Sequence, residues 1–176
     1  MAVVHQKKPW LWGRLSPLGL GIAIVTVALD QLHKYWMLAV YEIQNRGRVP
    51  ITPFLDLVYV KNTGISYGLF PQESDFGRYV LLALKLAAVV LLWIWLARAE
   101  QRLTALALGL IIGGAIGNAI DRLAHGAVVD FVLFHITTPT FNFTWYVFNL
   151  ADAAIVAGVI GLLYESFFGG RAVKAP

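Results

Sequence analysis

Residues 103–122 read LTALALGLIIGGAIGNAIDR. As a helix, this mainly apolar run is long enough to cross the hydrocarbon core of a bilayer. Small residues recur in it at every fourth position, at Ala105, Gly109, Gly113 and Gly117. That small-x-x-x-small pattern lets two helices approach closely in lipid, and helix packing alone is enough to explain it. The run therefore predicts a membrane helix that packs against a neighbour along one face.

The last turn of the same run is polar. The column of small residues continues to Asp121, and Gly114, Asn118 and Arg122 form the adjacent column. Such a polar turn is too costly to expose to lipid, so it must face protein or water. We therefore expect close helix packing to deliver Asn118, Asp121 and Arg122 to a junction at one end of the bundle.

The composition of the chain is that of a membrane protein. Of its 176 residues, 59% are hydrophobic and 14% are charged, whereas a soluble domain usually carries about 25% charged residues. Three more segments, at about 16–38, 78–98 and 146–168, are long and apolar enough to span a bilayer. The sequence thus predicts one all-α integral membrane domain over residues 1–176, with four transmembrane helices.

Several kinds of chemistry are excluded or disfavoured by composition. The chain has no cysteine, so it has no disulfide, thiolate nucleophile or cysteine-based metal site. Its four histidines show no H-E-x-x-H spacing, which disfavours a zinc site, and no cofactor is expected. The basic residues form no stripe and are not interleaved with aromatic residues, so nucleic acid is not a predicted partner.

Basic residues also predict the orientation. They occur at both ends of the chain and in the short link between the second and third spans, at Lys7, Lys8, Arg14, Arg98, Arg102, Arg171 and Lys174. By the positive-inside rule these regions are cytoplasmic, and the loops at about 39–77 and 123–145 face outward. The apolar run 18–29 follows basic residues as in a secretory signal, but no small-x-small cleavage site follows it. We therefore expect it to be retained as the first helix.

The first outer loop contains a β-rich insert at about 42–72. Val49–Val60 is rich in β-branched and aromatic residues, and Ile65–Phe70 is a second short apolar run. The polar stretch Lys61–Gly64 between them contains a glycine that can take a positive φ. This pattern predicts a β-hairpin that lies on the membrane or packs on the helix ends.

Asp30 and Lys34 are four residues apart on the first span, so they lie on the same face about one turn apart. An internal ion pair near the outer interface is the preferred interpretation over a chemical role. Lys85 in the second span is expected to snorkel toward the interface, and partnership with Asp30 is the alternative.

Two other aspartates have a different character. Asp130 lies in an apolar run after the third span, and Asp152 lies near the start of the fourth span with Asn149 three residues before it. A carboxylate beside lipid is costly and usually functional. A helix N-terminus accounts for Asp152 by itself, but Asp130 has no such structural role. If the two meet, they can share a proton and act as an aspartic-protease dyad. From the residues alone, catalysis, a proton relay and a structural role all remain open.

Five segments taken together resemble the signal peptidase II family, the bacterial lipoprotein signal peptidases. The likeness covers about residues 15–168 and rests on stretches in a fixed order: Asp30–Lys34, Asn62–Phe70, Gly117–Arg122, Val128–Phe131 and Phe148–Ile155. The resemblance implies four transmembrane helices with a small β-rich cradle on the outer, periplasmic face of the bacterial inner membrane.

The resemblance also implies a reaction and a site. The catalytic dyad would be Asp130 and Asp152, and Asp30 with Lys34 would be a structural pair. The pocket would be shaped by Asn62, Gly64, Asn118, Asp121, Arg122 and Asn149. The implied substrates are lipidated prolipoproteins, cut just before a cysteine that carries diacylglycerol. Membrane lipid is the other expected partner, and no oligomer is required.

Two other functions compete with a protease. One is a small proton-coupled transporter that uses the same aspartates as a relay, which would need a polar path through several helices. The inner halves of the last three spans are almost wholly apolar, which disfavours such a path. The other is a non-catalytic assembly factor, which would tolerate conservative changes at both aspartates.

Overall fold

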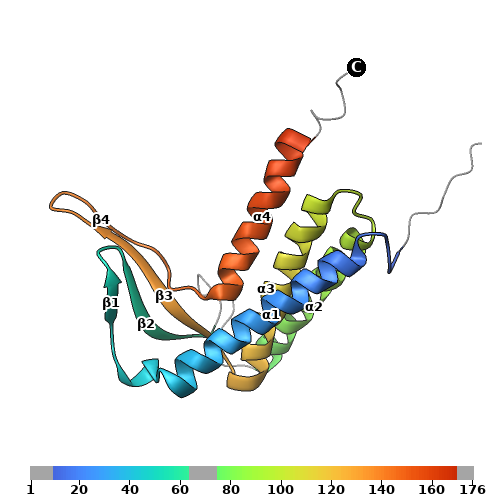
Figure 1. Cartoon of the computed structure of the whole chain (residues 1–176). Helices are drawn as coiled ribbons and strands as arrows, with labels where there is room; N and C mark the ends of the chain where they lie inside the picture. Colours follow the sequence, from blue (N-terminus) through green and yellow to red (C-terminus); the bar gives the residue numbers. More distant parts are fainter. Residues whose placement is uncertain (1–9, 64–74, 170–176) are drawn as a thin grey trace, which may run out of the picture.

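The computed structural model describes residues 10–63 and 75–169, without the side chains of residues 75–82 and 85. Its helices are α1 (Ser16–Tyr35), α2 (Asp75–Ala97), α3 (Arg102–His125) and α4 (Leu150–Phe168). A π-helical turn, η1 (Trp36–Val40), extends α1, and a short 3₁₀ turn, η2 (Ile43–Asn45), follows. The helices form a bundle, and a small sheet lies at the end where α1 finishes and α4 begins (Figure 1).

Three helices in the described part of the chain are long and apolar enough to cross a membrane. They are Ser16–Val40, Arg102–His125 and Leu150–Phe168. The described part of α2 adds a shorter apolar stretch, Leu86–Ala97. These helices are those of a multi-pass membrane protein with three to four spanning segments.

The small residues of α3 allow close packing on two sides. A Cβ atom on Gly109 would lie 2.6 Å from the carbonyl oxygen of Gly19, and one on Gly113 would lie 2.7 Å from that of Ala23, both on α1. A Cβ on Gly114 would instead meet the carbonyl oxygen of Ala151 on α4. The predicted packing face is confirmed, and the adjacent column forms a second one, so α3 lies between α1 and α4.

Two helix ends differ from the predicted spans. α3 continues to His125 and ends where Gly126 takes φ +72°, a left-handed conformation that suits glycine. α4 begins at Leu150, later than the predicted start at 146. The residues before α4 pair with the sheet instead, since Phe148 exchanges backbone hydrogen bonds with Val132.

The sheet is fully antiparallel and has the order β1-β2-β3-β4. Its strands are β1 (Val49–Thr52), β2 (Leu55–Asn62), β3 (Val128–Thr137) and β4 (Asn142–Thr144). The second outer loop, in which no strand was predicted, thus supplies half of these strands. Its residues pair with β2 over most of the length of that strand.

The predicted hairpin turn was wrong in position. The chain reverses between Thr52 and Leu55, whereas Lys61 and Asn62 are the last residues of β2. The Thr52 hydroxyl accepts a hydrogen bond from the Phe54 N–H within the turn, a local side-chain contact that favours turns. Pro53 was a usable signal for this turn, because proline favours turns and interrupts strands. The predicted second strand, Ile65–Phe70, lies outside the described residues.

A small core joins the sheet to the end of α1. Met37, Ile43, Val129 and Phe131 are each at most 1% exposed and pack together. Residues on both sides of Asp130 are therefore buried against protein. The apolar run around Asp130 is a strand whose first four residues, Val128 to Phe131, are buried in the protein.

Candidate active site

The start of α4 is held by a reciprocal cap that includes Asp152. The Asn149 side-chain oxygen accepts a hydrogen bond from the Asp152 N–H at 3.0 Å, and the Asp152 Oδ2 accepts one from the Asn149 N–H at 3.2 Å. These bonds satisfy two N–H groups that a helix start leaves unpaired. Asp152 therefore has the structural role that its position predicted.

Asn149 also reaches Asp130. Its Nδ2 donates to the Asp130 Oδ1 at 2.7 Å. The two residues meet because the backbone of Phe148 pairs with Val132 in β3, which places the next residue beside the strand that carries Asp130. Asn149 thus contacts both predicted catalytic carboxylates, Asp130 through its side-chain amide and Asp152 through its backbone N–H.

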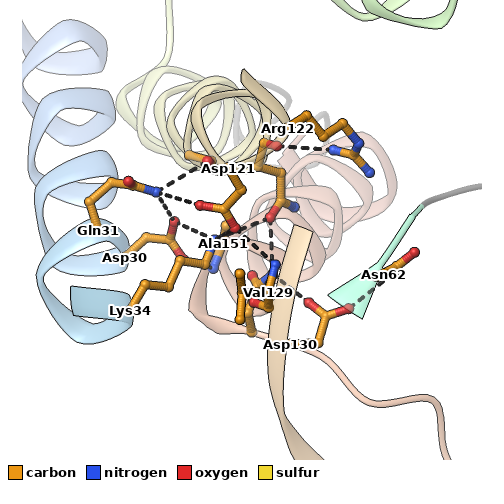
Figure 2. Close-up of polar contacts among 12 residues, drawn as sticks. Asp30, Gln31, Lys34, Asn62, Asp121, Arg122, Val129, Asp130 and Ala151 are labelled. Carbon is orange, nitrogen blue, oxygen red and sulfur yellow. Dashed lines mark hydrogen bonds and ion pairs between the residues drawn. The ribbon is translucent and has the colours of Figure 1, made fainter. Parts of the chain in front are cut away.

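The register of β2 and β3 brings a second amide to Asp130. Val60 is the direct partner of Asp130, and Asn62 lies two residues further along β2, on the same face of the sheet. The Asn62 Nδ2 donates to the Asp130 Oδ2 at 3.0 Å (Figure 2). Each oxygen of Asp130 is therefore bound by a neutral amide.

A third amide completes the link between the carboxylates. The Asn118 Nδ2 on α3 donates to the Asp152 Oδ1 at 2.7 Å, and the Asn118 Oδ1 accepts from the Asn149 Nδ2 at 3.0 Å. Asn118 and Asn149 thus form a hydrogen-bonded bridge. Asn118 belongs to the polar turn of α3, which was predicted to lie at a helix junction at one end of the bundle.

Asp130 is 1% exposed, whereas Asp152 is half-buried. Burial raises the pKa of Asp130 above its usual value of 3.8, and the neighbouring Asp152 carboxylate raises it further. Hydrogen bonds from Asn62 and Asn149, and the charge of Lys34, act in the opposite direction without cancelling the rise. Asp130 is thus biased toward its protonated form.

Lys34 lies in a second acidic cluster, which is joined to the first by a hydrogen bond of 3.4 Å from the Lys34 Nζ to the Asn118 Oδ1. Its Nζ lies 2.8 Å from the Asp30 Oδ2 and 2.7 Å from the Asp121 Oδ2. Gln31 donates to the same two carboxylates, at 3.1 Å and 3.0 Å. Figure 2 shows these α1 side chains pointing toward Asp121 on α3. The cluster is a buried ion-pair network.

This cluster also holds the backbone on either side of the dyad. The Asp30 Oδ1 accepts a hydrogen bond from the Ala151 N–H at 3.0 Å, and the Asp121 Oδ2 accepts one from the Val129 N–H at 3.1 Å. Ala151 immediately precedes Asp152, and Val129 immediately precedes Asp130. The ion-pair network therefore positions the two segments that carry the carboxylates.

The predicted site residues fall into three groups. Asn62, Asn118 and Asn149 surround the two aspartates. Asp121 belongs to the lysine network, and the half-buried Arg122 donates to the Asn118 carbonyl oxygen at 3.1 Å. Gly64 and the side chain of Lys85 lie outside the described residues.

The Asp30–Lys34 ion pair is confirmed, but two of its partners were missed. Asp121 shares the lysine, and Gln31 spans both carboxylates. A glutamine beside an aspartate in an otherwise apolar helix was a usable signal, because an amide at that depth needs a partner. The contact with Asp121 depends on how α1 and α3 pack, which spacing does not reveal.

The chain matches known proteins along most of its length. Residues 22–168 match the family model described as signal peptidase (SPase) II. A lipoprotein signal peptidase of Nitrobacter hamburgensis is 59% identical over 92% of this chain and 100% of that protein. One of Rhodopseudomonas palustris is 54% identical over the same shares, and one of Methylocella silvestris is 54% identical over 89% and 91%.

Two solved structures, both described as a bacterial membrane enzyme, have a similar fold. One is 27% identical with a TM-score of 0.67 and covers 91% of this chain and 93% of its own. The other is 25% identical with a TM-score of 0.64 and covers 96% and 99%. With the family match over residues 22–168, the chain belongs to the signal peptidase II family.

Proposed function

We propose that this protein is an aspartyl endopeptidase of the membrane that removes signal peptides from lipidated prolipoproteins. It cuts the peptide bond just before the cysteine that carries diacylglycerol. Relatives that share 50–59% of their residues with this chain are named lipoprotein signal peptidases, which supports the reaction class and the substrate. Asp130 and Asp152 are the proposed catalytic residues.

The contact of Asn149 with both carboxylates is the observation that carries this assignment. Asn149 donates to Asp130 at 2.7 Å and exchanges hydrogen bonds with Asp152. One rigid helix start thus sets the separation of the two groups. Preorganised carboxylates of this kind need little rearrangement to act on a bound substrate.

The two carboxylates have different environments, which supports a division of labour. Asp130, with its raised pKa, holds the proton, and the more exposed Asp152 is the base. Asp152 takes a proton from water as the water oxygen attacks the scissile carbonyl carbon, and Asp130 gives its proton to the carbonyl oxygen. When the C–N bond breaks, Asp152 passes its proton to the leaving amine and Asp130 recovers one from the collapsing hydroxyl.

The finer topology belongs to the same proposal. The chain forms one domain with four transmembrane helices, its ends are cytoplasmic, and the sheet end faces the periplasm. A lipid-linked substrate held in the outer leaflet of the inner membrane would then lie beside the carboxylates. The supporting observations are the distribution of basic residues and the position of the sheet at the end of the bundle that carries Asp130 and Asp152.

A proton relay receives less support from the same residues. The buried residues of α3 between Thr104 and Asn118 are alanine, leucine, isoleucine and glycine. These side chains offer no group that carries a proton between the two ends of the helix. The residues of α3 thus favour a reaction at the end of the bundle that carries Asp130 and Asp152 over proton transfer along the helix.

The test is cleavage of a diacylglyceryl-modified prolipoprotein by purified Asp130→Asn and Asp152→Asn. Both variants should fold and both should fail to cut. Asp56→Asn is the matched control, because Asp56 is also buried, at 2% exposure, but lies in the sheet with Arg48 and His135. Near-normal turnover by either dyad variant, or equal loss in the control, would refute the assignment.

A further inference from the structure

An apolar groove runs along the outside of the bundle, on a part of the molecule that the proposed reaction does not use. It has a volume of about 720 Å³ and is lined by α1, α2 and α3, including Val27, Ala28, Trp93 and Ile116. Two more of its lining residues, Ile24 and Val90, are 59% and 57% exposed. The groove is therefore open toward the surroundings of the bundle.

The packing of the helices explains why this groove exists. α1 and α2 each pack on α3, and they contact each other much less than either contacts α3. A gap between two helices in a membrane is not left empty or wet when its walls are apolar, because lipid chains fill it. A lipid acyl chain is thus the simplest occupant of the groove.

One end of the groove lies among tryptophan residues. Leu11 and Trp93 line this end, and the Trp93 Nε1 donates to the Leu11 carbonyl oxygen at 3.0 Å. Trp12 lies against Trp93, with ring centroids 6.0 Å apart. Tryptophan is typical of the level of lipid headgroups, where an apolar ring meets a polar layer. The groove therefore ends at headgroup depth.

Two arginines lie at this end. The guanidinium of Arg98 lies over the Trp10 ring, 4.6 Å from its centroid, and the Arg14 Nη2 donates to the Glu100 carbonyl oxygen at 3.1 Å. The Arg98 Nε is buried and has no hydrogen-bond partner in the described part of the chain. An arginine has five N–H donors in a planar fork that suits phosphate.

The local charge favours an anion. Segment 10–14 and link 98–102 together contain Arg14, Arg98 and Arg102 against the single acid Glu100. Basic pockets between membrane helices near the cytoplasmic surface bind anionic lipid headgroups. A second copy of this chain is a poorer occupant, because parallel copies in one membrane would bring the same positive ends together.

We propose that this groove binds one anionic phospholipid, with an acyl chain along Val27 and Trp93 and the phosphate at Arg14 and Arg98. The ligand class is a glycerophospholipid with net negative charge, taken from the leaflet at the Arg14 end. The site is separate from Asp130 and Asp152. It holds α1 and α2 together where their own contacts are sparse.

The first test compares lipid binding by native mass spectrometry of the full chain in detergent, titrated with phosphatidylglycerol or phosphatidylcholine. The wild type should retain one phosphatidylglycerol molecule and should bind phosphatidylcholine more weakly. The double variant Arg14→Gln/Arg98→Gln should weaken that binding by about 30-fold, at about fivefold for each arginine. Arg46→Gln/Lys61→Gln is the matched control, because it removes the same charge from exposed residues at the sheet end.

A second pair of variants tests the groove itself. Ala28 lines the groove, whereas its exposed neighbour Leu29 does not. Ala28→Trp should reduce phosphatidylglycerol binding while Leu29→Trp leaves it unchanged. Thermal midpoints measured for each variant without added lipid separate loss of the site from loss of the fold.

Three results would overturn the proposal. Equal retention of the two lipids by the wild type would show apolar adsorption only. An equal effect of the arginine pair and its control would show a general charge effect. A dimer that Ala28→Trp dissociates, with no change in lipid binding, would make a second copy the occupant.

Discussion

The two acidic clusters at the sheet end of the bundle differ in what binds their carboxylates. Asp30 and Asp121 share Lys34 and accept hydrogen bonds from backbone N–H groups. Asp130 and Asp152 are bound instead by the neutral amides of Asn62, Asn118 and Asn149, with the capping N–H at Asp152. A cation neutralises a buried carboxylate, whereas an amide orients it and leaves its charge in place.

That difference separates a structural role from a chemical one. A carboxylate paired with Lys34 has its charge balanced by that cation and its oxygens occupied by the network. Asp130 is buried, contacts no cation among the described residues, and has a raised pKa. Groups with such shifts are suited to acid–base catalysis.

The largest expected effect compares the clusters directly. Asp130→Asn should lower turnover of a lipidated substrate by on the order of 10³-fold or more while its thermal midpoint stays close to that of the wild type. Asp121→Asn should lose less activity than Asp130→Asn but more stability, about 1–3 kcal/mol. Kinetic assays and thermal unfolding in one detergent measure both. If both variants lost activity and stability to the same extent, the two clusters would not differ in role.

Removing the shared cation should strongly destabilise the structural cluster. Lys34→Met leaves Asp30 and Asp121 buried without their cation, so we expect a loss of about 3–5 kcal/mol in stability. Lys61→Met is the control, because Lys61 is exposed on β2. Thermal or denaturant unfolding in detergent gives the comparison. A stable Lys34→Met would mean that the ion-pair network contributes little to the stability of the fold.

Asn149 allows its cap and its amide to be separated. Asn149→Ser keeps an oxygen that can cap α4 but removes the Nδ2 that binds Asp130 and Asn118. Its activity should fall on the order of 100-fold, the effect of displacing a reacting group by about 1 Å, with the helix start intact. Asn149→Ala should lose about 1 kcal/mol of stability in addition. If serine restored full activity, the cap alone would be the role of Asn149.

The smallest expected effect is a pH dependence of stability. Because the folded pKa of Asp130 is raised above 3.8, the folded state holds this proton more tightly than the unfolded chain does. The stability from protonated Asp130 is therefore complete below pH 3.8 and is lost as the pH rises through the folded value. Asp130→Asn does not titrate, so its stability relative to the wild type should increase with pH over that window. Thermal midpoints of both proteins across a pH series give the measurement, and a constant difference would contradict the shift.

Residue patterns predicted much of the helical scaffold. The four-residue spacing of Gly109 and Gly113 identified the face of α3 that meets α1, because small side chains at that spacing leave room only for another backbone. The i, i+4 spacing of Asp30 and Lys34 identified their ion pair, because helix geometry alone brings those positions together. Contacts within one helix follow directly from its period.

The sheet was the harder part, since strand pairing joins residues that are distant in sequence. The turn at Pro53 was missed within a stretch rich in β-branched and aromatic residues, and β3 was not predicted as the partner of β2. Register within that pairing sets the contact between Asn62 and Asp130. A shift of one residue would have turned Asn62 to the other face.

Composition and local spacing were thus sufficient for a membrane bundle, for its close-packed third helix and for singling out Asp130 and Asp152, whereas Asn62 and Gly64 were implied only by the family resemblance. Which acid meets a lysine and which meets an amide depended on folding, because Asp121, Asp130 and Asp152 acquire their partners from other elements. Spacing along one helix determines neighbours only on that helix. The chemical character of a buried carboxylate comes from the groups that the rest of the chain packs against it.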